Sequence, residues 1–385
     1  MKNKKSFRII TITFLSVLFV IAGLCIAYFS LTYVPHHNVK IEGGTYSNSY
    51  LNTYSNIMPR LARVDNKLYY NASNDFFKYG TYEITTDYTK RVYWQGPALS
   101  WENISLDCVS DKTIFSPLIE NNKIQYYDFE NNRYEDYLQI SESDTESPKE
   151  LFVVNNEIYS CYCELCDYGN NFYSTYKLYR QAEDDIELIL SANDLDFDYI
   201  SAPQFYDKYI YFIAVQKLSD KENHDIKQFV CKYDLNNRTI VDKMLCFEGS
   251  EYGVGIEHFN CSTAVNNKVY GIAADQSNEH SDDSSEYVYS ADLNNKTSNL
   301  ILKSNGTAII NSYEDKVFIA VENGQDKGIY SVDTATDKVT KIFENDMDIN
   351  GLYIVDSKYL YFTDNSYFCL YRITQDGKTL EKVFG

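Results

Sequence analysis

One short pattern recurs along this chain, and it constrains the fold more than any other feature of the sequence. Each copy has a polar doublet, a basic or polar third residue, and then an aliphatic and aromatic run typical of a β-strand. The third residue, from Lys67 to Lys358, recurs every 42 to 60 residues, which matches the ~40–50 residues of a four-stranded propeller blade. The copies are DNKLYY at 65, SDKTIF at 110, NNEIYS at 155, YDKYIYF at 206, NNKVYG at 266, EDKVFI at 314 and DSKYLYF at 356.

A second element recurs within each unit, an aromatic strand followed by a tight polar turn and a further strand. In FVCKYDLNNRTIV at 229 and IYSVDTATDKVTKIF at 329, the Asn-Asn and Thr-Asp pairs tolerate the positive φ of hairpin turns. Runs such as LFVV at 151, TAII at 307 and GLYIV at 351 supply a strand before the repeat.

These units predict an all-β fold, a seven-bladed β-propeller preceded by one N-terminal transmembrane helix. Repeated hairpins cannot bury both faces alone, and closing them into a ring removes exposed sheet edges. Six or eight blades stay open as alternatives, as do an open β-sandwich array and two separate β domains.

The last unit resembles a known repeat. In LYFTDNSYFCLYRITQDGKTLEKVF, residues Tyr361-Phe362-Thr363-Asp364, Tyr371-Arg372-Ile373 and Asp376-Gly377 look like the YWTD strand, the I-x-R strand and the D-G turn of low-density lipoprotein receptor type propellers. The other units keep the strands and turns without the tetrad. The chain therefore resembles a divergent bacterial branch of such propellers. This resemblance implies an exported, membrane-attached binding or scaffold module and provides no catalytic residues.

The N-terminal segment is long and apolar enough to cross a membrane. Residues 9–35 carry no charge, and about 20 apolar residues span a bilayer as a helix. The preceding basic residues place the N-terminus in the cytoplasm by the positive-inside rule. We predict a cytoplasmic tail over 1–8, a transmembrane helix over 9–34, a polar stem over 35–58 and an extracytoplasmic propeller over 59–385, in a single-pass cell-membrane protein.

Two other fates of the N-terminus stay open. A lipoprotein would be anchored through Cys25, but Leu24 stands where that signal needs a small residue. A cleaved signal peptide would have an apolar core of only ~7–15 residues, which is shorter than the run seen here. Both alternatives are therefore less favoured than an uncleaved signal anchor.

The charge of the chain limits its partners. The formal net charge is −20 at pH 7, whereas contact with nucleic acid or anionic lipid headgroups needs a basic face. We expect a protein or cell-envelope polymer as partner, membrane attachment through the N-terminal helix, and no nucleic acid.

The cysteine and carboxylate clusters are better explained as structure than as metal sites. Cys161, Cys163 and Cys166 offer three thiols without a fourth zinc ligand, so we interpret them as small fillers between blades. Residues 194–198 resemble half a calcium loop but lack its later Gly and acid, which favours a connection between blades. The acidic run 280–286 is interpreted as a solvated loop. We predict no metal and no cofactor.

Disulfide connectivity stays undetermined from the sequence. Eight cysteines remain when Cys25 is set aside, and they allow ~105 full pairings. If Asn236-Asn237 form a two-residue turn, Cys231 faces Asp242 rather than Cys246. We therefore predict no disulfide within that hairpin.

Enzyme signatures are missing from the sequence. It contains no G-x-S-x-G elbow, no P-loop and no Gly-rich dinucleotide turn. The 55 Asp and Glu residues leave one enzymatic alternative, a glycan hydrolase or lyase with carboxylates at the channel mouth, one of them with a raised pKa. We favour a binding or scaffold module.

Recognition is expected on one face of the ring. Connections between the second and third strands vary in the sequence, at 71–80, 165–174, 216–227 and 275–286, and variable loops on a rigid scaffold commonly bind partners. The segment 94–101 brings both Trp residues to the same face. An alternative is that Trp94 packs between the first two blades. The predicted binding residues are Trp94, Trp101, Phe76, Phe77, Tyr168 and Phe172.

Overall fold

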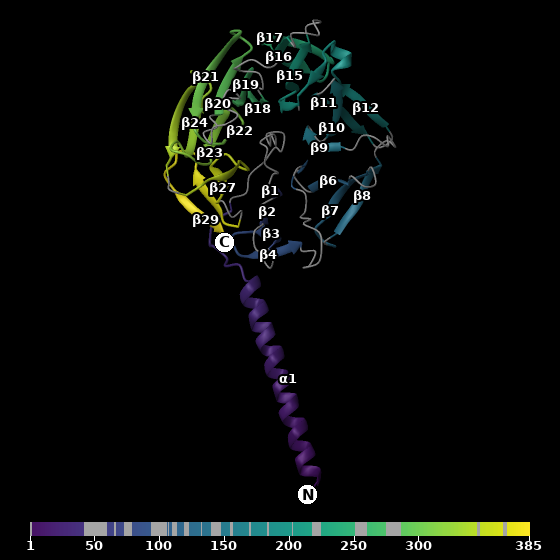
Figure 1. The fold of residues 1–385 in the computed structure, drawn as a ribbon, viewed down its shortest axis with the longest axis vertical. Coiled ribbons are helices and arrows are strands. Elements are labelled where there is room, and N and C mark those ends of the chain that lie inside the picture. The colour runs from purple at the N-terminus through teal and green to yellow at the C-terminus, as the bar shows by residue number, and fades with distance from the viewer. Residues whose placement is uncertain are drawn as a thin grey trace.

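The protein consists of one long helix attached to the outer edge of a ring of β-sheets (Figure 1). Helix α1 (Lys2–Thr32) precedes the strands. The computed structural model describes residues 2–41, 60–64, 67–72, 79–93, 106, 108–109, 114–118, 123–131, 133–139, 148–154, 157–168, 171–182, 185–201, 203–217, 225–250, 260–274, 286–344, 347–364 and 368–385.

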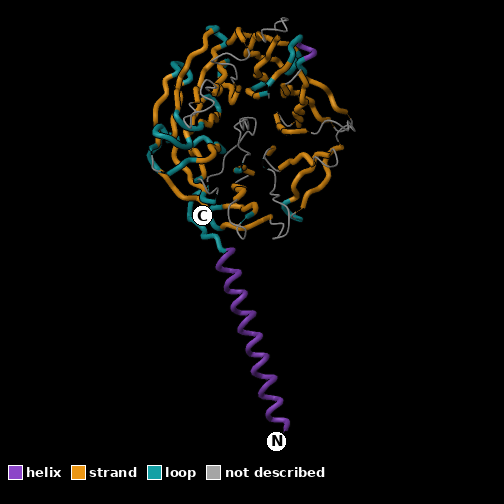
Figure 2. Tube along the Cα trace, viewed as in Figure 1, coloured by secondary structure: helices purple, strands orange, loops and turns teal. Residues whose placement is uncertain are grey.

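The strands pair into six four-stranded sheets and one five-stranded sheet, and Figure 2 shows them arranged around the ring. The first three sheets in chain order contain β1 (Leu61–Val64), β2 (Lys67–Ala72), β3 (Gly80–Ile84) and β4 (Thr89–Tyr93); β5 (Cys108–Val109), β6 (Ile114–Leu118), β7 (Lys123–Asp128) and β8 (Arg133–Gln139); and β9 (Pro148–Val154), β10 (Glu157–Tyr168), β11 (Asn171–Ala182) and β12 (Asp185–Leu190).

The remaining sheets complete the ring. They contain β13 (Tyr199–Ile200), β14 (Gln204–Tyr206), β15 (Tyr209–Lys217), β16 (Asp225–Asp234) and β17 (Thr239–Ser250); β18 (Asn260–Val265), β19 (Lys268–Ala274), β20 (Glu286–Asp292) and β21 (Thr297–Ser304); β22 (Ala308–Tyr313), β23 (Lys316–Val321), β24 (Gly328–Asp333) and β25 (Lys338–Phe343); and β26 (Asn350–Tyr353), β27 (Tyr359–Thr363), β28 (Leu370–Thr374) and β29 (Leu380–Phe384). A short 3₁₀ helix, η3 (Asn193–Leu195), precedes β13.

Every sheet is an antiparallel meander, so the prediction of an all-β, propeller-like ring after one apolar helix is confirmed. The predicted count of seven blades is wrong: the ring has six full blades, a number that the sequence left open as an alternative. Six sheets have innermost segments of four or more residues, counting β13 and β14 together, whereas β5 has two residues in the described part of the chain. The sheet β5–β8 is therefore the least complete unit of the ring.

The hairpin turns show how side chains set the strand register. Asp234 Oδ1 accepts the N–H groups of Asn236 and Asn237 at 2.9 and 3.0 Å, and the positive φ falls on Arg238 at 53°. A bulge between Lys232 and Tyr233 then shifts the strand by one position. As a result Cys231 pairs with Lys243 and not with Asp242 as predicted, and both Cys231 and Cys246 are free thiols.

One face of the ring carries the connections from second to third strands and from each sheet to the next, and we call it the loop face. The connections from second to third strands range from residues 169–170 to residues 275–285, so their predicted variability is confirmed. The predicted loop over 165–174 is wrong, because most of these residues pair as strands: Leu165 faces Ser174 and Tyr168 faces Asn171.

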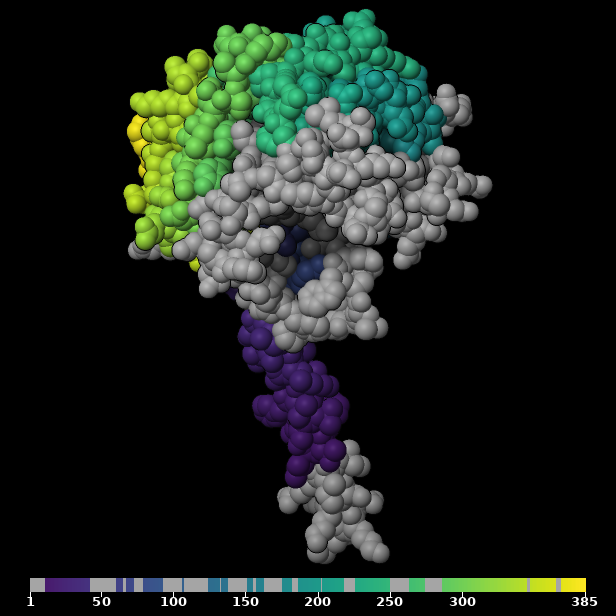
Figure 3. Space-filling view, turned by 45° about the horizontal axis from the view of Figure 1, so that its top comes forward, coloured from purple at the N-terminus to yellow at the C-terminus, as the bar shows by residue number. Residues whose placement is uncertain are grey.

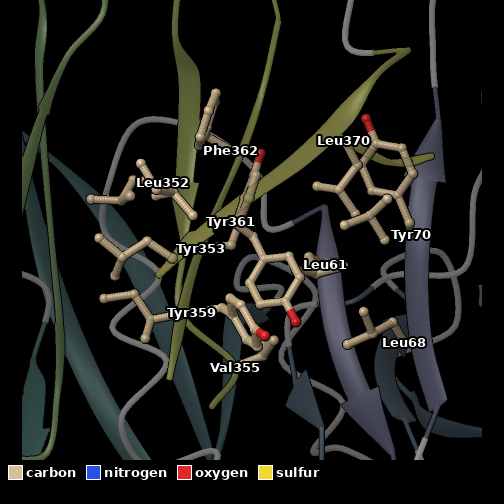
Figure 4. Packing of buried hydrophobic residues seen from close by; sticks show 14 of the residues in the cluster. Leu61, Leu68, Tyr70, Leu352, Tyr353, Val355, Tyr359, Tyr361, Phe362 and Leu370 are labelled. Atoms are coloured by element: carbon tan, nitrogen blue, oxygen red, sulfur yellow. The ribbon is translucent and has the colours of Figure 1, made fainter. Parts of the chain in front are cut away.

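Among the described residues, no strand from one end of the ring pairs into the sheet at the other end. The first sheet comes entirely from residues 61–93 and the last entirely from residues 350–384. The seam between them is a continuous apolar cluster in which Leu61, Leu68 and Tyr70 meet residues of β26–β28, as Figure 4 shows. Packing of side chains therefore holds together the two ends of the ring.

A short segment after the helix covers this seam, and we call residues 34–41 the strap. Val39 and Ile41 are buried in the seam cluster, and Val34 packs against it. His37 Nε2 lies 2.7 Å from the carbonyl oxygen of Gly385, and His36 Nδ1 lies 3.1 Å from Thr89 Oγ1. The first residues of the predicted polar stem thus contact both the first and the last sheet.

Arg372 fixes the strap from the last sheet. Its side chain is 2% exposed, and its Nη1 donates to the carbonyl oxygen of Lys40 at 3.0 Å. Its Nε donates to Glu381 at 2.7 Å, and the guanidinium lies over the Tyr359 ring at 4.0 Å. A buried arginine with these partners is satisfied rather than destabilising.

Turn residues also join neighbouring sheets elsewhere. Three residues at the same turn position, with φ of 53°, 55° and 57°, reach back to the preceding sheet. Only one of these pairs is largely buried, with Asp337 Oδ1 2.9 Å from Lys268 Nζ, and exposed pairs contribute little. The contacts are Arg238 with Glu187, Lys296 with Asp242, and Asp337 with Lys268.

Removal of a buried ring at the seam should destabilise the whole protein. Phe384 is fully buried, with ring centroids 5.2 Å from Tyr70 and 4.7 Å from Tyr82. Phe384→Ala should lower the free energy of unfolding by about 3–5 kcal/mol, measured by denaturant titration. Leu380→Ala, on the same strand but 41% exposed, is the control and should cost less than about 1 kcal/mol. Equal losses would contradict the seam assignment.

Candidate functional site

The loop face is the candidate functional surface because it carries the irregular features of the ring. In Figure 3, residues of the first sheet, in blue, are visible near the middle of the molecule. Two features near this face are described in detail. One is a hairpin longer than its sheet, and the other is a pair of half-buried carboxylates at the innermost strands.

The hairpin β10–β11 extends past the innermost strand of its sheet. Within the described residues, pairing between β9 and β10 ends at Pro148 and Tyr162, whereas β10 and β11 continue to pair as far as Tyr168 and Asn171. Six further residues of β10 therefore form a two-stranded ribbon, about 20 Å long at ~3.3 Å per residue. Near its base, Thr175 Oγ1 accepts the N–H of Ile200 in the next sheet at 3.2 Å.

The predicted binding residues fall partly within this feature. Tyr168 is the last residue of β10 and Phe172 the second residue of β11, so the structure places both at the end of one hairpin. The other predicted residues, Phe76, Phe77, Trp94 and Trp101, lie outside the described residues.

Two glutamates in neighbouring sheets each accept a hydrogen bond from the innermost strand of the sheet that follows. Glu286 begins β20, and its Oε2 accepts the N–H of Ala308, the first residue of β22, at 2.6 Å. Glu322 follows β23, and its Oε1 accepts the N–H of Gly351 in β26 at 3.4 Å. Each carboxylate thus contacts the start of the next sheet's innermost strand. The interpretation of 280–286 as a solvated loop is wrong for Glu286.

Burial determines the protonation of this pair. Desolvation raises the pKa of the Glu286 carboxyl, and a hydrogen bond from the Ala308 N–H opposes that rise. Desolvation also raises the pKa of Glu322, and the negative charge of Glu286 raises it further. Two carboxyls with raised pKa values hold a proton more readily than exposed carboxyls do, and they can also act only as acceptors between sheets.

The other predicted clusters have structural roles where they are described. Cys161 is fully buried in a core cluster between sheets, as expected for a small filler, whereas the side chains of Cys163 and Cys166 lie outside the described residues. In the segment 194–198, Asp194 accepts the Ser191 hydroxyl at 2.6 Å and Asp198 accepts the Lys217 N–H at 2.6 Å. Within the described residues, no group of three His, Cys, Asp or Glu side chains surrounds a common metal position.

The sequence did not single out Glu286 and Glu322. Both lie at strand ends, where an acidic residue is expected from the sequence to be exposed to solvent. Their burial depends on contact with a neighbouring sheet, which the local sequence does not indicate. A detectable signal was their position next to repeat strands, because Glu322 comes three residues after Ile319, the last residue of the EDKVFI unit.

Comparisons with known proteins give only remote similarities. No family model and no curated protein sequence matches the chain. Among solved structures, the chain is similar to a Mycobacterium tuberculosis puromycin-hydrolyzing peptidase (7% identity, TM-score 0.44, covering 90% of this chain and 56% of that one). It is also similar to an oligogalacturonate lyase in complex with manganese (8% identity, TM-score 0.44, covering 77% of this chain and 82% of that one). A third similar structure is the tricorn protease (10% identity, TM-score 0.48, covering 88% of this chain and 34% of that one). The chain thus spans about half of that peptidase and a third of the tricorn protease.

The raised pKa of Glu322 leads to a pH-dependent prediction. A carboxyl whose pKa is higher in the folded protein stabilises the fold at acidic pH, and this contribution is lost as pH rises through the folded pKa. Glu322→Gln keeps an oxygen acceptor for Gly351 and has no charge. The variant should therefore unfold at a higher temperature than the parent at pH 7.5 and lose this advantage at pH 4.

The control for this prediction is Glu344→Gln, because the Glu344 side chain is 80% exposed. Thermal unfolding of both variants at the two pH values provides the measurement. The control should change little at either pH. A Glu322→Gln variant that is less stable than the parent at pH 7.5 would show that the ionised carboxylate is needed between the sheets.

Proposed function

We propose that this protein is a membrane-tethered, extracytoplasmic propeller that binds a protein or a cell-envelope polymer at its loop face. The observation that carries the proposal is the β10–β11 hairpin, which extends six residues beyond the innermost strand of its sheet. A ribbon that projects from a rigid scaffold can enter or grip a partner without deforming the core.

The helix supports the tethering part of the proposal. Residues Thr11–Thr32 have a mean hydropathy of 2.5, and none of this segment is buried against the rest of the protein. An apolar helix of this length is stable in a bilayer and costly in water. The basic N-terminal residues favour a cytoplasmic N-terminus, which would place the ring outside.

The aromatic residues predicted from the sequence complete the proposed binding rim. Tyr168 and Phe172 lie at the hairpin end. Phe76, Phe77, Trp94 and Trp101 lie outside the described residues and stay part of the rim as predicted from the sequence. Aromatic side chains give large contact area at low entropic cost, both against sugar rings and at protein hot spots.

Carboxylate chemistry on glycans is the second candidate function. The observation that favours it is the pair Glu286 and Glu322, whose raised pKa values suit a general acid. Glycan turnover by the purified protein, abolished by Glu322→Gln while the fold is retained, would favour this function over simple binding.

Removal of the hairpin aromatics tests the binding proposal. The double variant Tyr168→Ala with Phe172→Ala should bind isolated cell envelopes at least about tenfold more weakly. This factor corresponds to a loss of ~1.4 kcal/mol of binding free energy from the two side chains together. Tyr137→Ala, which removes a tyrosine that is 50% exposed on β8, is the matched control and should bind like the parent. Unchanged retention of a folded double variant in a sedimentation assay would refute the proposal.

A further inference from the structure

The helix and the ring are joined without a spacer. The Tyr33 N–H still donates to the Phe29 carbonyl at 2.9 Å, and Val34 already packs against the seam. From the last helical residue, Thr32, to His36 the chain can extend at most about 14 Å. Whatever holds the helix therefore lies close to the outer edge of the ring.

The strap attaches the helix to a particular part of that edge. His36 Nε2 lies 3.1 Å from the Thr86 carbonyl oxygen, and the Ile41 N–H donates to Thr86 Oγ1 at 3.1 Å. His37 contacts Gly385 at the end of β29. Figure 1 shows the helix leaving the ring beside β29 and β4, roughly within the plane of the ring. A membrane around the helix would meet the ring at its edge and not at either face.

The local charge of this edge differs from that of the whole chain. We define the seam edge as the strap with residues 85–93 and 375–384, which include the outermost strands β4 and β29. It has slightly more basic than acidic side chains, although the chain carries a net charge of −20. Its charged residues are Lys40, Lys90, Arg91, Lys378 and Lys382 against Asp87, Asp376 and Glu381.

Two exposed tyrosines lie near the point where the helix ends. Tyr33 is 66% exposed directly after α1, and Tyr88 is 42% exposed two residues beyond Thr86. Tyrosine prefers the headgroup layer, where its ring is in an apolar region and its hydroxyl remains hydrated. Basic side chains near the surface add attraction to anionic headgroups.

We infer that the seam edge is a lipid-binding surface and that the ring stands upright on the membrane, with the seam edge against the phospholipid headgroups. This inference rests on the proposed membrane anchor and adds an orientation and a lipid contact to it. The whole-chain charge argues against headgroup contact in general, but the acidic excess lies elsewhere in the chain. In this orientation the loop face and its hairpin point sideways, parallel to the membrane surface.

Site-specific photo-crosslinking in lipid tests the orientation. The full-length protein is reconstituted in nanodiscs of phosphatidylcholine and phosphatidylglycerol, with p-benzoylphenylalanine in place of Tyr88. The matched control has it in place of Tyr137, a tyrosine of similar exposure on the outermost strand of the second sheet. Mass spectrometry should find several-fold more lipid adducts at position 88 than at position 137.

The outcomes separate this inference from the proposed anchor. Equal adducts at both positions, or none at position 88, in a protein that resists carbonate extraction from membranes would overturn the upright orientation and leave the anchor in place. Release of the protein by carbonate would overturn the anchor and the orientation together. Thermal unfolding of both labelled proteins shows that each retains its fold.

Discussion

The ring depends on a seam that none of the described strands crosses. A propeller whose ends share no sheet must hold its first and last sheets together by side-chain packing, because backbone hydrogen bonds end at each sheet edge. Here the contact is made by Leu61, Tyr70 and their neighbours against β26–β28, and by Phe384 against Tyr70 and Tyr82. Loss of this contact would expose the largest apolar cluster of the described residues.

The strap links that seam to the helix. Val39 and Ile41 add apolar area to the seam, while Arg372 binds the strap backbone from the last sheet. The same residues that close the ring also fix where the helix leaves it. Stability of the ring and its proposed position on the membrane are therefore two consequences of one set of contacts.

Sequence patterns predict the regular parts of this fold well. Apolar alternation after each polar doublet places strands such as β19, β23 and β27 correctly, and the long apolar run predicts α1. Local irregularities are harder to foresee, because their cause is not local. The bulge at Lys232 shifts a pairing by one residue, and residues 165–168 pair with residues 171–174 instead of belonging to a loop.

The functional features depend most on distant partners. In the sequence, Val39 and Ile41 alternate with polar residues, which is typical of a solvated stem. In the structure they are buried against a sheet that lies more than 300 residues away along the chain. In the sequence, Glu286 and Glu322 resemble acidic residues of solvated loops. In the structure each accepts a hydrogen bond from a backbone N–H of the next sheet. No pattern within one repeat encodes such contacts between repeats, so the sequence predicts the strands of each sheet better than the contacts between sheets.

Hydrogen exchange measured peptide by peptide tests the role of the strap most directly. In a variant with Val39→Ser and Ile41→Ser, we expect faster exchange in β1–β2 and β26–β29, at the two sides of the seam. Exchange in β18–β21, on another part of the ring, should stay as in the parent protein, since local opening follows local contacts. Exchange that is unchanged at the seam, or that rises equally in all sheets, would contradict closure of the ring by the seam and strap.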